Sequence, residues 1–202
     1  MRITGGAFRS RALRAPRGSA TRPTSDRVRE ALFAILASHG ALENARVLDL
    51  YAGTGALAFE ALSRGAAFAT LVESSREAIG ALRANVAALG LEDRTHVLAL
   101  DLRKALPRIV DRGPFDLVFA DPPWSLVGGG DVLRALSDLV SAETLAGEAL
   151  IVLEHAARTP SLAPEGLVRT DARRYGDTAL TFYKPAILGP PRYEDSTGHT
   201  SE

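Results

Sequence analysis

Short apolar runs alternate with amphipathic segments along most of this chain. Five buried strands are predicted by the runs ARVLDL, FATLVE, THVLAL, FDLVFA and EALIVLEH. Before and between them, apolar positions recur with helical spacing, which predicts helices over residues 24–40, 55–65, 75–90, about 103–111 and 131–145. Strands that alternate with helices of this length form a mostly parallel sheet with helices on both faces. The pattern therefore predicts an α/β fold.

The two ends of the chain follow a different pattern. The runs LVRTDARRY and TALTFYK, separated by Gly and Asp, predict a closing antiparallel hairpin. Residues 1–23 are rich in Arg, Gly, Ser and Pro, and they predict a basic extended arm with a small hairpin around Gly5 and Gly6 and few apolar side chains for the core. Residues 186–202 are polar and rich in Pro and Gly, which predicts a disordered tail. We therefore expect one folded domain, over residues 24–185, between the arm and the tail.

Length and composition fit a single globular domain. The 202 residues are 46% hydrophobic and 24% charged, which is enough apolar material for a sizeable core. No apolar run approaches the roughly 18 residues of a membrane span, and the first residues lack the apolar stretch of a secretory signal. The absence of cysteine excludes disulfides, thiolate metal sites and a Cys nucleophile. We expect a cytoplasmic protein that holds no metal, since the four His have no metal-binding spacing.

Positive charge is concentrated at the start of the chain, although the net charge is zero. Residues 1–29 contain eight Arg and a single acid, Asp26, so this segment carries +7 and the remainder −7. A basic arm on an acidic body favours a polyanionic partner. The alternative is a solvated, flexible tail, which the charge distribution by itself does not exclude.

Candidate chemistry lies just past the ends of the predicted strands, where doubly wound sheets bind ligands. Gly53 and Gly55 lie in the turn between the first of the five strands and its helix, and GTGALA fits a dinucleotide-binding pattern as well as an ordinary strand–helix turn. Glu73 lies 20 residues after Gly53, at the end of the second strand, where a carboxylate binds ribose hydroxyls. Together these residues favour a ribose-containing cofactor.

Asp49 discriminates between two candidate cofactors, NAD and S-adenosyl-L-methionine. It lies four residues before Gly53, at the end of the first strand, where it would repel the pyrophosphate of NAD. S-adenosyl-L-methionine (AdoMet) carries an ammonium and a sulfonium and no phosphate, so this acid favours an AdoMet site. Asp101, after the third strand, either accepts a hydrogen bond from the adenine amino group or caps the helix that follows.

The run FDLVFADPPW places an acid, two prolines and the only Trp of the chain at the end of a buried strand. On its own, DPPW is either a catalytic motif or a Pro-rich loop with a packing Trp. The ordered motifs DLYAGTG, LVE, LALD and DPPW, over roughly residues 46–184, resemble those of class I AdoMet-dependent methyltransferases that modify exocyclic amino groups. This resemblance implies a Rossmann-like fold with a mostly parallel seven-stranded sheet and a C-terminal antiparallel hairpin.

A narrower resemblance covers nearly the whole chain up to about residue 186. The blocks RITGGAFRSRAL, TRPTSDRVREALFAIL, DLYAGTGALAFEALSRGA, DPPW and YGDTALTFY are similar to those of the bacterial RsmD family. Members of that family methylate the N2 amino group of a guanine in small-subunit (16S) rRNA with AdoMet. Two departures are mild: Trp124 stands where Phe or Tyr is commoner, and the C-terminal tail is extra.

The resemblance assigns roles to individual residues. The residues implied to bind AdoMet are Asp49, Tyr51, Ala52, Gly53, Thr54, Gly55, Glu73, Ser74, Asp101 and Leu102. The residues implied in catalysis are Asp121, Pro122, Pro123 and Trp124. The residues implied to contact rRNA are Arg9, Arg11, Arg22 and Arg27, although for each of them a solvated surface charge is the alternative.

The chemistry of amino-group methylation explains the DPPW motif. The lone pair of an exocyclic amine is delocalised into the ring, so the amine is a poor nucleophile. Hydrogen bonds from its two N–H groups to the Asp121 carboxylate and the Pro122 carbonyl would localise that lone pair, while the prolines stiffen the turn. Trp124 offers a face on which a splayed-out base stacks, worth about 1–3 kcal/mol. Methyl transfer is then an in-line displacement that needs positioning, and neither a metal nor a strong base.

The sequence therefore predicts a monomeric rRNA guanine-N2 methyltransferase that acts on free rRNA or on an assembling ribosomal subunit. One alternative is an adenine-N6 methyltransferase on DNA or RNA, because DPPW serves either amino group. A DNA enzyme usually needs a recognition domain, for which this length leaves little room. Another alternative is a non-catalytic RNA- or nucleotide-binding module.

Overall fold

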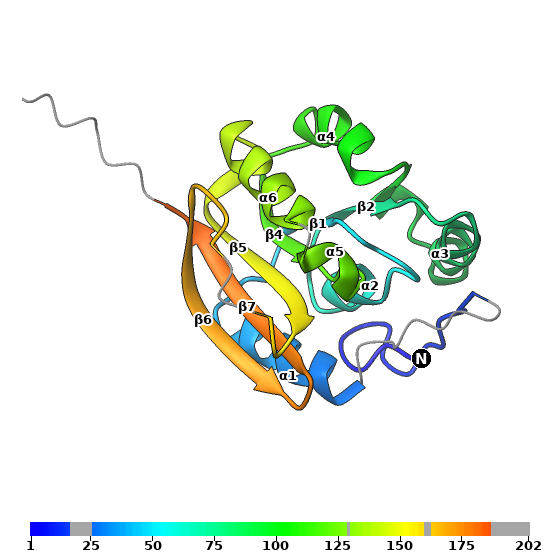
Figure 1. Cartoon of the computed structure of the whole chain (residues 1–202). Helices are drawn as coiled ribbons and strands as arrows, with labels where there is room; N and C mark the ends of the chain where they lie inside the picture. The colour runs from blue at the N-terminus through cyan, green and yellow to red at the C-terminus, as the bar shows by residue number, and fades with distance from the viewer. Residues whose placement is uncertain (17–25, 129, 160–162, 187–202) are drawn as a thin grey trace, which may run out of the picture.

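A seven-stranded sheet with the strand order β3-β2-β1-β4-β5-β7-β6 runs through the molecule (Figure 1). The computed structural model describes residues 1–16, 26–128, 130–159 and 163–186. The strands are β1 (Arg46–Asp49), β2 (Phe68–Glu73), β3 (Thr95–Ala99), β4 (Phe115–Ala120), β5 (Leu145–Ala156), β6 (Leu167–Tyr175) and β7 (Thr178–Pro185). Strands β1 to β5 pair in parallel, and β7 is antiparallel to both of its neighbours. The predicted sheet and its closing hairpin are confirmed.

Helices cover both faces of this sheet. They are α1 (Asp26–Ser38), α2 (Ala56–Ser63), α3 (Arg76–Leu89), α4 (Leu102–Val110), α5 (Trp124–Gly128) and α6 (Asp131–Ser141), with a 3-10 turn, η1 (Glu92–Arg94). In β1, Val47 packs with side chains of α1, α2 and α3, whereas the next residue, Leu48, packs with side chains of α4 and α6. Because successive side chains of a strand point to opposite faces, the two groups of helices lie on opposite sides. None of the helices in the described ranges has the length and apolar character that a membrane crossing requires.

Most predicted boundaries agree with the observed ones to within about three residues. The expected cap of α1, at Thr24 or Ser25, lies outside the described residues. The last predicted helix ends at Ser141, because β5 begins already at Leu145, paired with Phe115 of β4. Helix α5, which follows DPPW, was not predicted.

The start of the chain folds back into a small loop and packs on the body. Arg2 and Ala12 form an antiparallel bridge, which confirms the small hairpin predicted around Gly5 and Gly6. Within this loop, Ile3 is 1% exposed and Leu13 is 6% exposed, and both belong to the main core. The expectation that the arm adds few apolar side chains to the core is therefore wrong for these two residues, since one side of the loop is turned inward.

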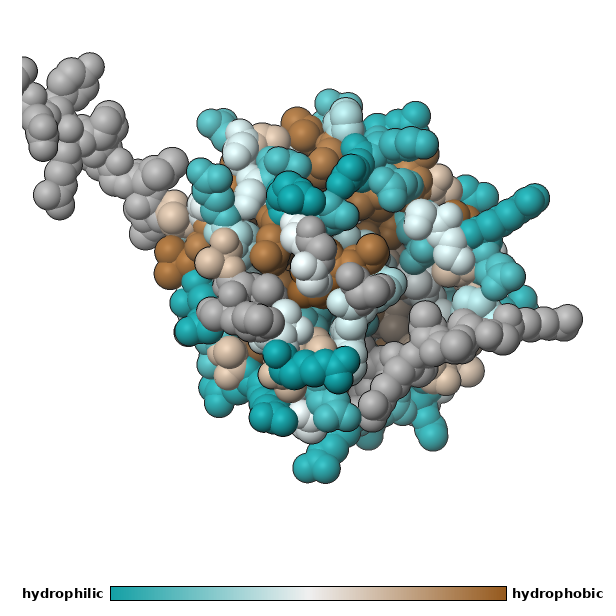
Figure 2. Space-filling model, in the orientation of Figure 1, coloured by the Kyte–Doolittle hydropathy of each residue, from teal (hydrophilic) through white to brown (hydrophobic). Residues whose placement is uncertain are grey.

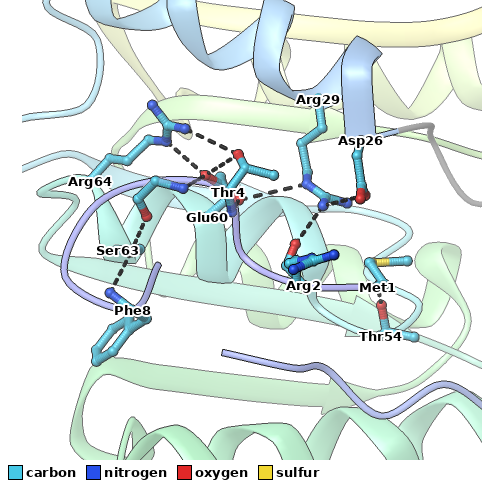
Figure 3. A network of polar contacts seen from close by, with 11 residues as sticks. Met1, Arg2, Thr4, Phe8, Asp26, Arg29, Thr54, Glu60, Ser63 and Arg64 are labelled. Atoms are coloured by element: carbon cyan, nitrogen blue, oxygen red, sulfur yellow. Dashed lines mark hydrogen bonds and ion pairs between the residues drawn. The ribbon is translucent and has the colours of Figure 1, made fainter. Parts of the chain in front are cut away.

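The carboxylate of Glu60 attaches this loop to α2 (Figure 3). Glu60 is completely buried, and its Oε1 accepts hydrogen bonds of 2.8 Å from the Thr4 hydroxyl, the Gly5 amide and Arg64 Nε. Its Oε2 accepts a further 2.8 Å bond from the Thr4 amide and lies 3.6 Å from Arg29 Nε. A buried carboxylate is tolerated only when its lone pairs are satisfied in this way.

Arg29 of α1 completes the cluster that Glu60 organises. Its side chain is 1% exposed, and Nη2 donates to the carbonyl of Arg2 at 2.6 Å and to the Asp26 carboxylate at 2.8 Å. One of the eight Arg of the basic segment is therefore part of the interior and is not available to a polyanion. It joins α1 to the same loop that Glu60 holds from α2.

Gly6 lets the loop approach the end of α2 closely. A Cβ at this position would lie 1.9 Å from the carbonyl oxygen of Ser63, and the backbone φ of +74° also favours glycine. Ser63 in turn donates its hydroxyl to the Gly5 carbonyl at 2.5 Å and accepts a 2.8 Å bond from the Phe8 amide. The loop is thus fixed along α2 by Glu60 and Ser63, one turn apart.

We expect Glu60→Ala to lower the free energy of unfolding by about 3–5 kcal/mol, because it breaks the buried pair with Arg29, which would keep only Asp26 as a carboxylate partner, and removes the acceptor of the Thr4 and Gly5 amides. The measurement is urea unfolding followed by circular dichroism. The control is Glu148→Ala, whose exposed carboxylate pairs with the exposed Lys184 and should leave the unfolding midpoint unchanged. Equal midpoints for the two variants would mean that the Glu60 cluster adds nothing to stability.

Candidate active site

Three acids meet where the carboxyl ends of the central strands come together. Asp49 is the last residue of β1, Glu73 is the last residue of β2, and Asp121 directly follows β4. The strand order reverses between β1 and β4, which is where open α/β sheets bind ligands. Burial, and after it the negative charges of Asp121 and Glu73, raise the pKa of Asp49, as expected for carboxylates that lie close together.

Glu73 holds the glycine turn that follows β1. Its Oε2 accepts a 2.8 Å bond from the Gly53 amide, and its Oε1 accepts bonds from the amides of Ser74 and Ser75 at 2.8 and 2.7 Å. A carboxylate has about four lone-pair directions, so one remains for a ligand hydroxyl. The acid that was predicted to bind ribose therefore also fixes the turn on which the cofactor would rest.

Gly55 is required by the space around the same turn. A Cβ there would lie 2.3 Å from the ring of Phe59, and the backbone φ is +83°. Thr54 is half-buried between the two glycines, and Ala52 is buried before them. The turn therefore lies with its backbone beside the acids at the strand ends, and a role of these residues in cofactor binding stays a prediction.

Asp49 is a buried acid with an incomplete set of partners. It is 1% exposed, and among the described residues its Oδ1 has no hydrogen-bond partner. Burial above all, and then the charge of Asp121, raise the pKa of Asp49 to about 8, against hydrogen bonds from the backbone of Tyr51 and Ala58. A cationic ligand group would supply both a donor and a compensating charge. The residues present therefore fit the ammonium of AdoMet and would disfavour a pyrophosphate.

The acid that follows the third strand is more exposed than Asp49 and Glu73. Asp101 is exposed, and its Oδ1 accepts a 3.1 Å bond from the Arg103 amide, so it caps α4 as the alternative interpretation expected. Leu102 behind it is buried. Burial and the charges of Asp101 and Asp131 raise the pKa of Tyr51 to about 12, which places Tyr51 near Asp101. A contact of Asp101 with adenine stays a prediction.

The DPPW motif forms the turn from β4 into α5. Asp121 and Trp124 are half-buried, Pro122 is buried, and Pro123 is exposed. The carbonyl of Pro123 accepts a 2.8 Å bond from the Leu126 amide, so the turn runs directly into the helix. Figure 2 shows apolar surface, in brown, over the region of α5, to which Leu126 contributes with 40% of its surface exposed. A flat base could stack at such a surface beside the carboxylate.

The four predicted RNA-binding arginines have different surroundings. Arg9 and Arg27 are exposed. Arg11 donates to the carbonyl of Ala88 in the last turn of α3 at 2.8 Å. Arg22 lies outside the described residues. Within the ranges that the structure covers, no group of three or more His, Asp and Glu is placed to hold a metal ion.

Two buried residues near this site, Glu60 and Asn85, make hydrogen bonds that were not predicted from the sequence. A signal for Glu60 was present, because it lies in α2, a helix whose other side chains are almost all apolar and buried. A charge in such a helix has to find its partners inside the protein. Asn85 gave no comparable signal, since a polar residue on an amphipathic helix is usually solvated.

The family model described as Conserved hypothetical protein 95 matches residues 1–184. YlbH of Bacillus subtilis is 34% identical over 187 residues, which cover 91% of this chain and 98% of YlbH. Ribosomal RNA small subunit methyltransferase D of Escherichia coli is 40% identical over 155 residues, 76% of this chain and 74% of that protein. The solved structure of yhhF from Escherichia coli has a TM-score of 0.77 at 34% identity and covers 92% of this chain and 97% of its own.

The seven-stranded sheet with helices on both faces superimposes on the structure of yhhF with this TM-score of 0.77, so the predicted Rossmann-like class I methyltransferase fold is confirmed. The family match extends over the N-terminal loop as well as the sheet. The chain thus belongs to the Conserved hypothetical protein 95 family, which is the RsmD family that its motifs resemble.

Proposed function

We propose that this protein transfers a methyl group from AdoMet to the exocyclic N2 amino group of a guanine in small-subunit rRNA. The observation that carries the proposal is the meeting of Asp49, Glu73 and Asp121 at the strand ends, with a buried Asp49 oxygen that lacks a partner beside the DPPW turn. AdoMet-dependent RNA methylation follows from the family, whose relatives in Escherichia coli and Haemophilus influenzae bear the name Ribosomal RNA small subunit methyltransferase D. The proposal adds to this the base and the atom that receive the methyl group, which are guanine and its N2.

The cofactor would be held mainly by the first two strand ends. Asp49 would face its ammonium, and the remaining lone pair of Glu73 would accept from a ribose hydroxyl. The further residues proposed to line the cofactor are Tyr51, Ala52, Gly53, Thr54, Gly55, Ser74, Asp101 and Leu102. When bound, AdoMet supplies a methyl group on a positively charged sulfur.

Asp121 and its neighbours would prepare the amino group. The Asp121 carboxylate and the Pro122 carbonyl accept the two N–H bonds of the amine, which localises the nitrogen lone pair toward the methyl donor. Trp124 stacks on the base, so that the reacting atoms are aligned. Asp121 is half-buried and open to solvent, so it can pass the released proton to water.

The rRNA would approach from the side of the N-terminal loop. The residues proposed to contact it are Arg9, Arg11, Arg22 and Arg27. Guanidinium groups bind phosphates and stack on bases, and RNA-modifying proteins recognise unstacked bases in loops. The proposal includes a cytoplasmic monomer that acts on free rRNA or on an assembling subunit, with residues 1–23 as the basic arm. The predicted tail, residues 186–202, lies outside the described residues from residue 187 on.

The proposed function is tested by incubating the protein with tritiated AdoMet and with small-subunit rRNA from a strain that lacks the homologous enzyme. We expect radioactive N2-methylguanosine after digestion to nucleosides. N6-methyladenosine would instead support the adenine-N6 alternative. Binding of RNA without any methylated nucleoside would support a non-catalytic module.

We expect Asp121→Ala to reduce methyl transfer to below about 1% of the wild-type rate, because it removes a hydrogen-bond acceptor of the reacting amine. Cofactor affinity should stay equal or rise, since the Asp121 charge acts unfavourably on Asp49. Single-turnover methylation and calorimetry with S-adenosylhomocysteine measure the two effects. Asp116→Ala, at the other end of β4, is the control and should keep full activity. A variant of Asp121 that kept a tenth of the rate would contradict its role.

We expect the affinity for S-adenosylhomocysteine, which retains the ammonium group, to rise with pH by up to about tenfold per unit from about pH 6 to about pH 8. Asp49 has a pKa raised to about 8 in the free protein, so below that pH a proton must leave before the carboxylate can bind the ammonium. Above that pH the affinity should level off.

Calorimetry in buffers of different ionisation enthalpy would show the released proton. Asp49→Asn should bind more weakly and lose both the pH slope and the proton release. If the slope persisted in Asp49→Asn, another group would be responsible for it.

A further inference from the structure

Asn85 of α3 joins the N-terminal loop to the cofactor turn. Its side chain is 1% exposed, and its Oδ1 accepts a 2.8 Å hydrogen bond from the Arg14 amide. Its Nδ2 donates two bonds of 3.0 Å, one to the carbonyl of Arg14 and one to the carbonyl of Thr54. One amide group therefore holds two segments that lie far from it in the sequence.

The orientation of this amide is determined by its partners. The Arg14 amide is a donor and must face Oδ1, so Nδ2 faces the two carbonyls. Both N–H groups of Asn85 and its oxygen are then satisfied in a buried position. Only glutamine offers the same amide group, and its side chain is one methylene longer.

The loop and α3 contact each other at a second point. Arg11 donates to the carbonyl of Ala88, three residues after Asn85 and therefore on the same face of the helix. Figure 1 shows the N-terminal segment beside α2 and α3. At its other end the loop is held by Glu60 of α2, the helix that begins directly after the cofactor turn. The loop thus lies against both helices that frame this turn.

We propose that Asn85 is a positioning residue that couples cofactor binding to rRNA binding. The inference rests on the proposed function, in which the turn around Thr54 binds AdoMet and the N-terminal loop binds rRNA through Arg9 and Arg11. A ligand that orders the backbone at Thr54 or at Arg14 also orders the Asn85 side-chain amide, which bonds both carbonyls. The second ligand then binds to a site that is already ordered. Such a coupling is reciprocal: each ligand strengthens the binding of the other by the same factor.

The test is calorimetry with S-adenosylhomocysteine, in the absence and presence of a saturating in vitro transcript of small-subunit rRNA. We expect the transcript to tighten binding to the wild-type protein at least about fivefold. Asn85→Asp keeps the size of the side chain and an acceptor for the Arg14 amide, but it has no N–H group for the two carbonyls. In this variant we expect the ratio of the two affinities to fall to within about twofold of one.

A matched control separates coupling from stability. Thr95→Val removes a comparable side-chain hydrogen bond, from the Thr95 hydroxyl to the Leu91 carbonyl at 2.8 Å, on the strand beside α3. The Thr95→Val variant should keep the wild-type ratio of the affinities for S-adenosylhomocysteine with and without the transcript, even if its melting temperature falls. If Asn85→Asp fails to fold, Asn85→Ser, whose hydroxyl cannot span both carbonyls, is subject to the same expectation.

Two results would overturn the inference. One is a wild-type protein whose affinity for S-adenosylhomocysteine is the same with and without the transcript. The other is an Asn85 variant that binds each ligand more weakly but keeps the wild-type ratio, because its role would then be structural only. The binding experiment does not depend on methyl transfer, so the two proposals can fail separately. If the two ligands strengthen each other's binding but no N2-methylguanosine forms, only the proposed function is wrong. If N2-methylguanosine forms but the two ligands bind independently, only this inference is wrong.

Discussion

The buried carboxylate of Glu60 is the interaction that ties the separate parts of this molecule together. It accepts hydrogen bonds from Thr4, Gly5 and Arg64 and pairs with Arg29, so it joins the N-terminal loop, α1 and α2 (Figure 3). A charge in the interior is costly unless nearly every lone pair is satisfied, which leaves the loop little freedom to move away. Because α2 begins at the cofactor turn, this one group also places the start of the chain beside the active site.

Asp49 differs from Glu60 in the number of hydrogen-bond donors around its carboxylate. Both acids are buried, but Glu60 has a full set of donors, whereas one oxygen of Asp49 has none among the described residues, and its pKa is raised to about 8. A fully partnered buried acid is suited to a structural role, and a buried acid with an unpartnered oxygen beside other acids is suited to a cationic ligand. The number of donors around each carboxylate therefore separates the structural acid from the one that is ready for a cation.

Sequence periodicity predicted the parallel part of the sheet because β1 to β4 are short, contain mostly apolar residues and are each followed by a helix. The acids of the site were predictable for the same reason, since parallel strands bring their carboxyl ends to one edge. The packing of the loop was not predictable, because Ile3 and Leu13 stand alone among Arg and Gly and show no period. The contacts of Glu60 and Asn85 span 56 and 71 residues, and no local pattern encodes pairs at such separations.

The N-terminal loop therefore cannot be treated as a separable RNA-binding appendage. Its inward side contributes Ile3 and Leu13 to the core, while Arg9 is exposed on its surface. Methyl transfer to an amine requires the base and the methyl donor at one place at one time, so a segment that touches both regions is well placed to coordinate them. The same packing that stabilises the loop holds it against the turn around Thr54 through Asn85, so under the proposed function stability and substrate binding would depend on shared contacts.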